Sequence, residues 1–203
     1  MRTHQLPAFV ILAVVGLALT GCATQAHYVD PAGSQLVTTV GQINVQDFSN
    51  AADTMVNSLI DNLINQNKLP SSVPNEPALL AISRITKNTG SQIDTDLLIK
   101  KIRVALLRTG KVQTSTTLNL GGPEDPLAAD QRKMAEFIAG GKIPTRMPDY
   151  TLSGKIIENR AKAGDIRQSA FVFQLSLSSP AGVAIWEDEK TIVKQGSKPA
   201  VGF

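Results

Sequence analysis

The sequence has few of the residues on which most catalytic and metal sites depend. Its 203 residues include one cysteine, Cys22, and two histidines, His4 and His27, and all three lie near the N-terminus. Without a histidine or a further cysteine in the body of the chain, Ser-His-Asp and Cys-His nucleophile systems and ordinary zinc sites are excluded. The glycine-rich loops that bind nucleotide phosphates are also missing. We therefore expect no metal site, no cofactor and no small-molecule substrate.

An excess of charge of one sign is also missing. The chain carries 20 basic and 17 acidic residues and has a formal net charge of +3. No stripe of lysine and arginine stands out, which argues against nucleic acid as a partner. Two carboxylates could form an acid-base pair, but Asp94 lies where it would cap a helix, and Glu187 opens an acidic run at a strand end. A carboxylate-dependent hydrolase stays open as an alternative, although nothing points to an enzyme.

The single cysteine follows a long apolar run. Residues 6–19 contain no charge, Arg2 precedes them, and the run is shorter than the roughly 20 residues that a membrane-spanning helix needs. These features are typical of a secretory signal. The exit, LTGC at residues 19–22, resembles the lipobox of bacterial lipoproteins. That resemblance implies cleavage before Cys22, acylation of its thiol and its new amine, and, with no aspartate following, sorting to the outer membrane. A free cysteine in a signal that is cut elsewhere is the alternative.

The remaining chain divides by composition. We assign residues 1–21 to the signal peptide, 22–45 to the lipidated cysteine and a flexible tether, 46–196 to one globular domain and 197–203 to a C-terminal tail. The tether would span at most about 80 Å when extended and about 27 Å as a coil. A short strand near residues 36–45 stays open.

Hydrophobic spacing predicts three helices and five strands in the domain. A first helix covers residues 47–68, with Ser49 or Asn50 as its cap, and Asp94 and Asp125 cap two more helices. The first expected strand begins at residue 78, and the second lies within residues 111–116. The other three cover residues 149–162, 166–178 and 183–193. The order α-β-α-β-α-β-β-β predicts a single α/β (α+β) domain whose mixed sheet is flanked by helices on one or both faces.

One segment carries a family resemblance. Residues 79–115, LLAISRITKNTGSQIDTDLLIKKIRVALLRTGKVQTS, resemble the periplasmic lipoproteins that activate penicillin-binding proteins, the LpoB family. DFSNAADTMVNSLI at residues 47–60 is similar to the family's first helix, and GVAIWEDEKTIVKQ at residues 182–195 to its last strand. The resemblance covers roughly residues 45–195 and implies a fold like the N-terminal domain of TolB.

The resemblance also implies a function. An outer-membrane lipoprotein facing the periplasm would dock on a bifunctional peptidoglycan synthase, a penicillin-binding protein, and stimulate it allosterically during cell-wall synthesis. Such an activator must bind the active conformation of the synthase more tightly than the resting one. We expect docking through Arg84, Lys87, Asn88 and Thr89, although Asn88 and Thr89 could simply hold their turn. The alternative is a subunit of an outer-membrane assembly like the curli-secretion lipoproteins.

Overall fold

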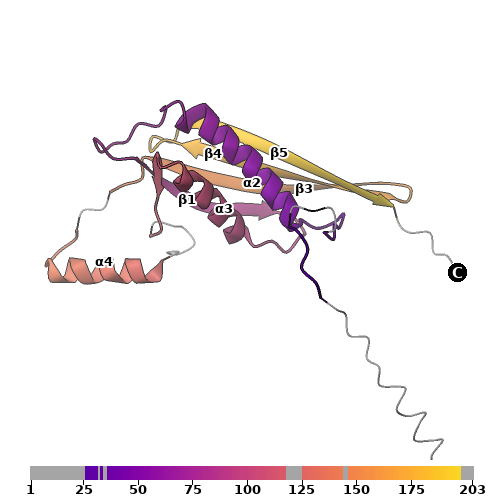
Figure 1. Cartoon of the computed structure of the whole chain (residues 1–203), viewed down its shortest axis with the longest axis horizontal. Coiled ribbons are helices and arrows are strands. Elements are labelled where there is room, and N and C mark those ends of the chain that lie inside the picture. Colours follow the sequence, from indigo (N-terminus) through magenta and orange to yellow (C-terminus); the bar gives the residue numbers. More distant parts are fainter. Residues whose placement is uncertain (1–25, 32, 34–35, 118–124, 144–145, 198–203) are drawn as a thin grey trace, which may run out of the picture. The chain divides into compact units, whose positions relative to one another are not determined.

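The computed structural model describes residues 26–31, 33, 36–117, 125–143 and 146–197 and divides the chain into two compact units, residues 1–36 and 37–203. The signal, Cys22 and residues 198–203 of the tail lie outside the described residues. Figure 1 shows the helices and strands of the described residues, which lie in the second unit. Their order is α2 (Val45–Leu59), a π-helical turn (Ile60–Ile64), β1 (Ala78–Asn88), α3 (Thr95–Arg108), β2 (Val112–Thr114), α4 (Pro126–Ile138), β3 (Tyr150–Ala163), β4 (Ile166–Ser178) and β5 (Ala184–Ser197). The predicted order is confirmed.

The first helix, α2, begins earlier than its expected start at residue 47. Its cap is Asn44, whose backbone N–H donates to the Asp47 carboxylate at 2.7 Å, and the proposed caps Ser49 and Asn50 lie inside the helix. The regular α-helix ends at Leu59, and a π-helical turn replaces the last predicted turns. Residues 36–44 contain turns and no strand, so the strand left open there is not formed.

The caps of the other two helices are those that the sequence predicts. The Asp94 carboxylate accepts the backbone N–H of Asp96 at 2.9 Å at the start of α3, and Asp125 accepts that of Ala128 at 3.0 Å at the start of α4. Gly110 follows α3 with a φ of +66°, a left-handed conformation that glycine adopts without strain. None of the helices among the described residues is long and apolar enough to cross a membrane.

The sheet contains five strands in the order β2-β1-β3-β4-β5. β1 is parallel to both β2 and β3, as expected when helices connect strands, whereas β3, β4 and β5 form antiparallel hairpins. Gly164 and Gly182 lie in the two hairpin turns with φ values of +57° and +78°. The sheet is therefore mixed, as predicted.

The hydrophobic core lies between one face of this sheet and the helices α2 and α3. On β4 the side chains of Phe171, Phe173, Leu175 and Leu177 are buried, and Trp186 of β5 is buried beside them. The ring of Phe48 on α2 meets that of Phe173 edge to face, with centroids 6.0 Å apart. Each fully buried side chain of this size contributes roughly 2–3 kcal/mol to folding. Within the described chain, helices therefore cover one face of the sheet and not both.

Lys194 fixes the chain that leads into α2. Its ammonium, largely buried on β5, donates to the carbonyl oxygens of Gln42 at 2.7 Å and Thr39 at 3.3 Å, and it also contacts Asn44 Oδ1 and the Asp47 carboxylate. These contacts join residues 39–47 to the last strand, about 150 residues further along the chain. The end of the segment assigned to the tether is thus held against the domain.

Candidate docking surface

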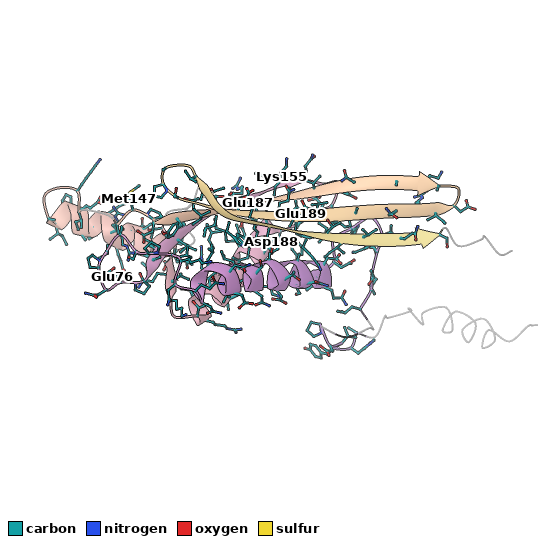
Figure 2. The ribbon with its side chains drawn as sticks, turned by 90° about the horizontal axis from the view of Figure 1, so that it is seen from above. Glu76, Met147, Lys155, Glu187, Asp188 and Glu189 are labelled. Atoms are coloured by element: carbon teal, nitrogen blue, oxygen red, sulfur yellow. The ribbon has the colours of Figure 1, made fainter. Side chains whose placement is uncertain are left out.

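The face of the sheet away from α2 and α3 carries mostly polar side chains. Because successive side chains of a strand point to opposite faces, each strand that contributes to the core also contributes to this second face. We call it the open face, and it comprises Ser83, Arg84 and Thr86 of β1, Ser153 and Lys155 of β3, Gln174 and Ser176 of β4, and Glu187 and Glu189 of β5. Figure 2 shows Lys155 on this side of the sheet, with α2 on the other.

A bulge in β1 places Arg84 on the open face. Ile82 pairs with Leu152 and Ile85 pairs with Gly154, so Ser83 and Arg84 together lie opposite one residue of β3. A bulge of this kind redirects a side chain without breaking the sheet. Arg84 and Lys155 consequently line one hollow of about 550 Å³.

The acidic residues of the open face are oriented by hydrogen bonds from β4. The amide of Gln174 donates to Glu189 at 2.8 Å, and the hydroxyl of Ser176 donates to Glu187 at 2.8 Å. Both donors are neutral side chains, so neither contact is an ion pair. The two carboxylates lie two strands from Lys155, or roughly 10 Å at the usual strand spacing. The open face therefore has a basic side on β1 and β3 and an acidic side on β5.

The four residues proposed from the sequence do not form a single patch. Arg84 belongs to the open face, and Asn88 is exposed at the last position of β1. The amine of Lys87 instead donates to the carbonyl of Ile93 at 3.2 Å, in the loop before α3. The hydroxyl of Thr89 accepts the Ser91 N–H at 3.1 Å and so holds the turn. Whether any of them contacts a partner stays a prediction.

Sequence reasoning missed the residues that surround Arg84. The alternation of β4 already placed Gln174 and Ser176 on its polar side, which was a usable signal. Lys155 could not be paired with Arg84 in advance, because their proximity depends on the register of β1 against β3 and on the bulge.

The most strongly shifted carboxyl group has a structural role. Asp149, buried at the start of β3, would have its pKa raised by burial, but hydrogen bonds from Ser72, from the Leu79 amide and from Arg146 outweigh this and lower it to about 2. Its oxygens accept the Leu79 N–H at 2.7 Å and an Arg146 nitrogen at 2.8 Å. Asp149 thus joins β3 to the chain before β1, and its environment explains its ionisation without a catalytic role.

The chemistry that this arrangement supports is recognition. Among the described residues, no group of three or more histidine, cysteine, aspartate or glutamate side chains could hold a metal ion. Asp94, half of the carboxylate pair considered above, is a helix cap. The open face instead presents charged and polar side chains over a packed α+β core.

The family is shown by comparison with known proteins. Residues 47–192 match the model of the peptidoglycan-synthase activator LpoB, and the chain therefore belongs to this family. The family consists of envelope lipoproteins that activate peptidoglycan synthases, and its members are regulators rather than enzymes. A search of curated protein sequences finds no match.

Solved structures give more distant likenesses. The C-terminal domains of LpoB from Escherichia coli and from Salmonella enterica are each 16% identical in sequence to this chain. Each alignment covers 72% of this chain and 98% of the LpoB domain, with a TM-score of 0.41. The PelC dodecamer from Paraburkholderia phytofirmans is 18% identical, with 64% of this chain and 81% of that chain covered and a TM-score of 0.29. Because all three TM-scores lie below 0.5, we base the family assignment on the sequence match alone.

Proposed function

We propose that the protein is a lipid-anchored activator that binds a bifunctional penicillin-binding protein in the periplasm and stimulates its glycan polymerisation allosterically. The match of residues 47–192 to the activator family supports this proposal most strongly. The polar and charged side chains of the open face agree with a function exerted through contact.

The anchor is Cys22, at the end of the LTGC sequence, and it holds the protein on the outer membrane. One acyl chain gives only marginal attachment to a bilayer, whereas two or more make it stable. With residues 1–21 removed as a signal, a tether over residues 22–45 precedes the domain at 46–196 and the tail at 197–203. A Cys22→Ala variant should leave the membrane fraction and lose its function in cells.

The docking surface is the open face. Arg84 and Lys155 present positive charge there. Asn88, Lys87 and Thr89, at the end of β1 and in the turn that follows it, are a second proposed contact, separate from Arg84. Neither Arg84 nor Lys155 has an ion-pair partner among the described residues, so both charges are available to a partner. Contact speeds the synthase only if it favours the active conformation over the resting one.

A polymerisation assay tests the proposal. The mature chain from residue 23, without lipid, is mixed with detergent-solubilised penicillin-binding proteins of the same cell, and glycan synthesis is followed with and without it. We expect a faster rate with at least one synthase and no effect on a heat-inactivated one. If no co-resident synthase binds the chain or responds to it, the proposed function is wrong.

Charge reversal locates the surface. The double variant Arg84→Glu with Lys155→Glu should lower the affinity for the synthase at least about tenfold, because like charges in an interface are strongly unfavourable. Arg108→Glu with Lys133→Glu, two exposed reversals on α3 and α4 that change the net charge by the same amount, is the matched control and should leave the affinity unchanged. Equal losses in both variants would place docking elsewhere.

A further inference from the structure

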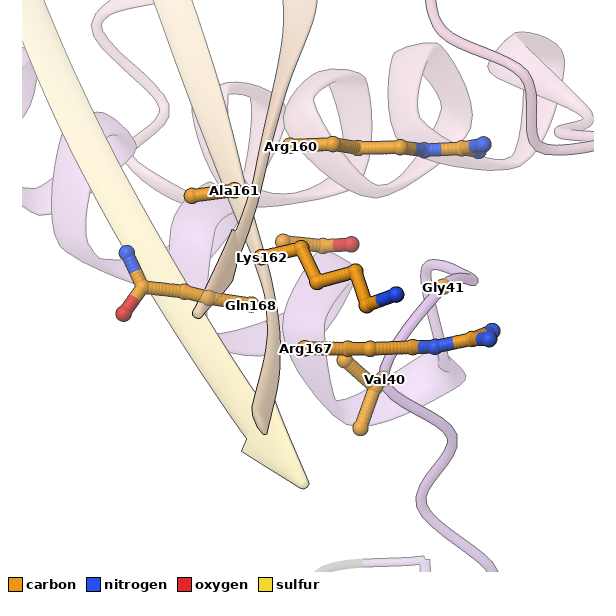
Figure 3. A pocket seen from close by; sticks show the side chains of 8 residues that line it. Val40, Gly41, Arg160, Ala161, Lys162, Arg167 and Gln168 are labelled. Carbon is orange, nitrogen blue, oxygen red and sulfur yellow. The ribbon is translucent and has the colours of Figure 1, made fainter. Parts of the chain in front are cut away.

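Three basic side chains gather near the end of the β3–β4 hairpin. Arg160, Lys162 and Arg167 line a pocket of about 460 Å³ whose other wall includes Val40 and Gly41. Figure 3 shows the three side chains extending in the same direction, towards the loop that carries Val40 and Gly41. The strand register explains this common direction. Lys162 pairs with Arg167 and Arg160 pairs with Ser169, so the three basic side chains lie on the same face of the hairpin. We call Arg160, Lys162 and Arg167 the basic hairpin end.

The charges of the basic hairpin end are only partly balanced. Arg160 donates to the Glu158 carboxylate at 2.6 and 3.0 Å, which neutralises it and fixes its direction. Lys162 and Arg167 have no hydrogen-bond or ion-pair partner in the described part of the chain, and the remaining acidic residue of the hairpin is Asp165, in the turn. Like charges that face each other across two strands are destabilising. An anion bound between Lys162 and Arg167 would remove that repulsion.

The position of the pocket on the chain suggests which anion it meets. Val40 and Gly41 lie just before α2, where Lys194 holds residues 39–47 against β5. A chain anchored at Cys22 therefore enters the domain beside the basic hairpin end. Taken as the flexible tether proposed above, the roughly 19 intervening residues would measure only about 24 Å as a coil. The headgroups around the anchor are thus the anions to which this end of the domain is most often exposed.

We infer that the basic hairpin end binds the phosphates of anionic phospholipid headgroups in the leaflet that holds the lipid anchor. This inference rests on the proposed anchor at Cys22. Lys162 and Arg167 make the phosphate contacts, and Arg160 is oriented beside them by Glu158. A weak contact is sufficient, because a short tether keeps the local concentration near the millimolar range. The contact orients the domain on its membrane.

Vesicle binding by the mature chain from residue 23 tests the contact without the lipid. The chain should bind vesicles of phosphatidylcholine containing phosphatidylglycerol, bind pure phosphatidylcholine vesicles far less, and lose binding as the salt concentration rises. Lys162→Gln with Arg167→Gln should weaken binding roughly 30-fold, the loss expected for two basic side chains at an anionic surface. Arg108→Gln with Lys133→Gln removes the same charge elsewhere and should bind like the unchanged protein. Equal weakening in both pairs, or equal binding to both kinds of vesicle, would overturn the inference.

A soluble phosphate could also bind to the basic hairpin end, because it carries the same chemical group as a lipid headgroup. Inorganic phosphate and glycerol phosphate, added at concentrations that leave the ionic strength constant, should compete with the vesicles only weakly, since one phosphate lacks the many neighbours of a membrane surface. Saturable binding of inorganic phosphate with no preference for anionic vesicles would show that the site serves a soluble ligand, and the inference would be wrong.

A fluorescent label gives the orientation directly. The chain from residue 23 has no cysteine, so Ala163→Cys labels the basic hairpin end and Val183→Cys labels the turn at the other end of β4, roughly 40 Å away. A quencher attached to the lipid should quench the first label and spare the second. The reverse pattern would overturn the inference. The outcome of the lipid-free polymerisation assay does not depend on vesicle binding. If no synthase responds in that assay, the proposed function is wrong, but the vesicle-binding result is unaffected.

Discussion

On β4, Phe171, Phe173 and Leu175 are buried beneath the helices, whereas the alternating Gln174 and Ser176 lie on the open face and bind carboxylates of β5. The same backbone thus carries two surfaces with different tasks. The covered face supplies the apolar burial that stabilises the fold, and the open face supplies oriented charge at little cost to stability. The difference can be tested one residue at a time.

The largest effect is expected from the covered face. Phe173→Ala should lower the free energy of unfolding by about 4 kcal/mol, because the cavity adjoins Phe48 and α2 has little freedom to collapse into it. Urea denaturation of the mature chain measures this. Val172→Ala, the next residue and on the opposite face, should cost about 1 kcal/mol. Similar losses at both positions would mean that the two faces do not differ as described.

A second prediction concerns the buried amine that holds residues 39–47. Lys194→Met should cost about 3 kcal/mol, because it leaves the buried Asp47 carboxylate without its cation and removes a donor from two carbonyl oxygens. Adding Asp47→Asn should recover part of this loss, since the uncompensated charge is then removed. Lys190→Met on the same strand is the control and should stay within about 0.5 kcal/mol of the unchanged protein. Equal stability of the Lys190 and Lys194 variants would contradict the contacts described.

The third prediction is a pH dependence. The pKa of Asp149 is about 2 in the folded protein, below its unfolded value of 3.8, so its ionised form stabilises the native state. That contribution, about 2 kcal/mol, is complete above pH 5 and is lost as the pH falls through 4 towards 2. Unfolding free energies measured across this range should fall, and Asp149→Asn should flatten the curve while lowering stability at neutral pH. An unchanged slope in the variant would assign the acid sensitivity to other groups.

The sequence predicted those features that depend on neighbours along the chain. The caps Asp94 and Asp125, the glycines of the hairpin turns and the alternation of β4 are all local, and each is observed. The cap of α2 was misplaced because Asn44 is selected by contacts with Asp47 and with Lys194, on the last strand.

The candidate surface was harder to predict for a related reason. Arg84 was identified from the turn that follows it, but its neighbour Lys155 is brought there by strand register and by one extra residue in β1. Lys87 and Thr89 look exposed in sequence, yet both form hydrogen bonds within the loop before α3. Predicting a surface that is assembled from four strands requires the register of all four strands. The periodicity along a single strand does not give that register.

The smallest effect on stability should come from the open face, where function and folding separate most clearly. Ser176→Ala removes the hydrogen bond that orients Glu187, but both groups remain close to water, so the free energy of unfolding should change by less than about 0.5 kcal/mol. If the acidic side of the open face contacts the synthase, the freed carboxylate must be ordered again on binding, and the affinity should fall a few-fold. Ser178→Ala, on the same face of β4, is the control and should change neither quantity. A loss of stability at Ser176 comparable with that at Phe173 would show that the open face is part of the folding core, and the distinction between the two faces would no longer hold.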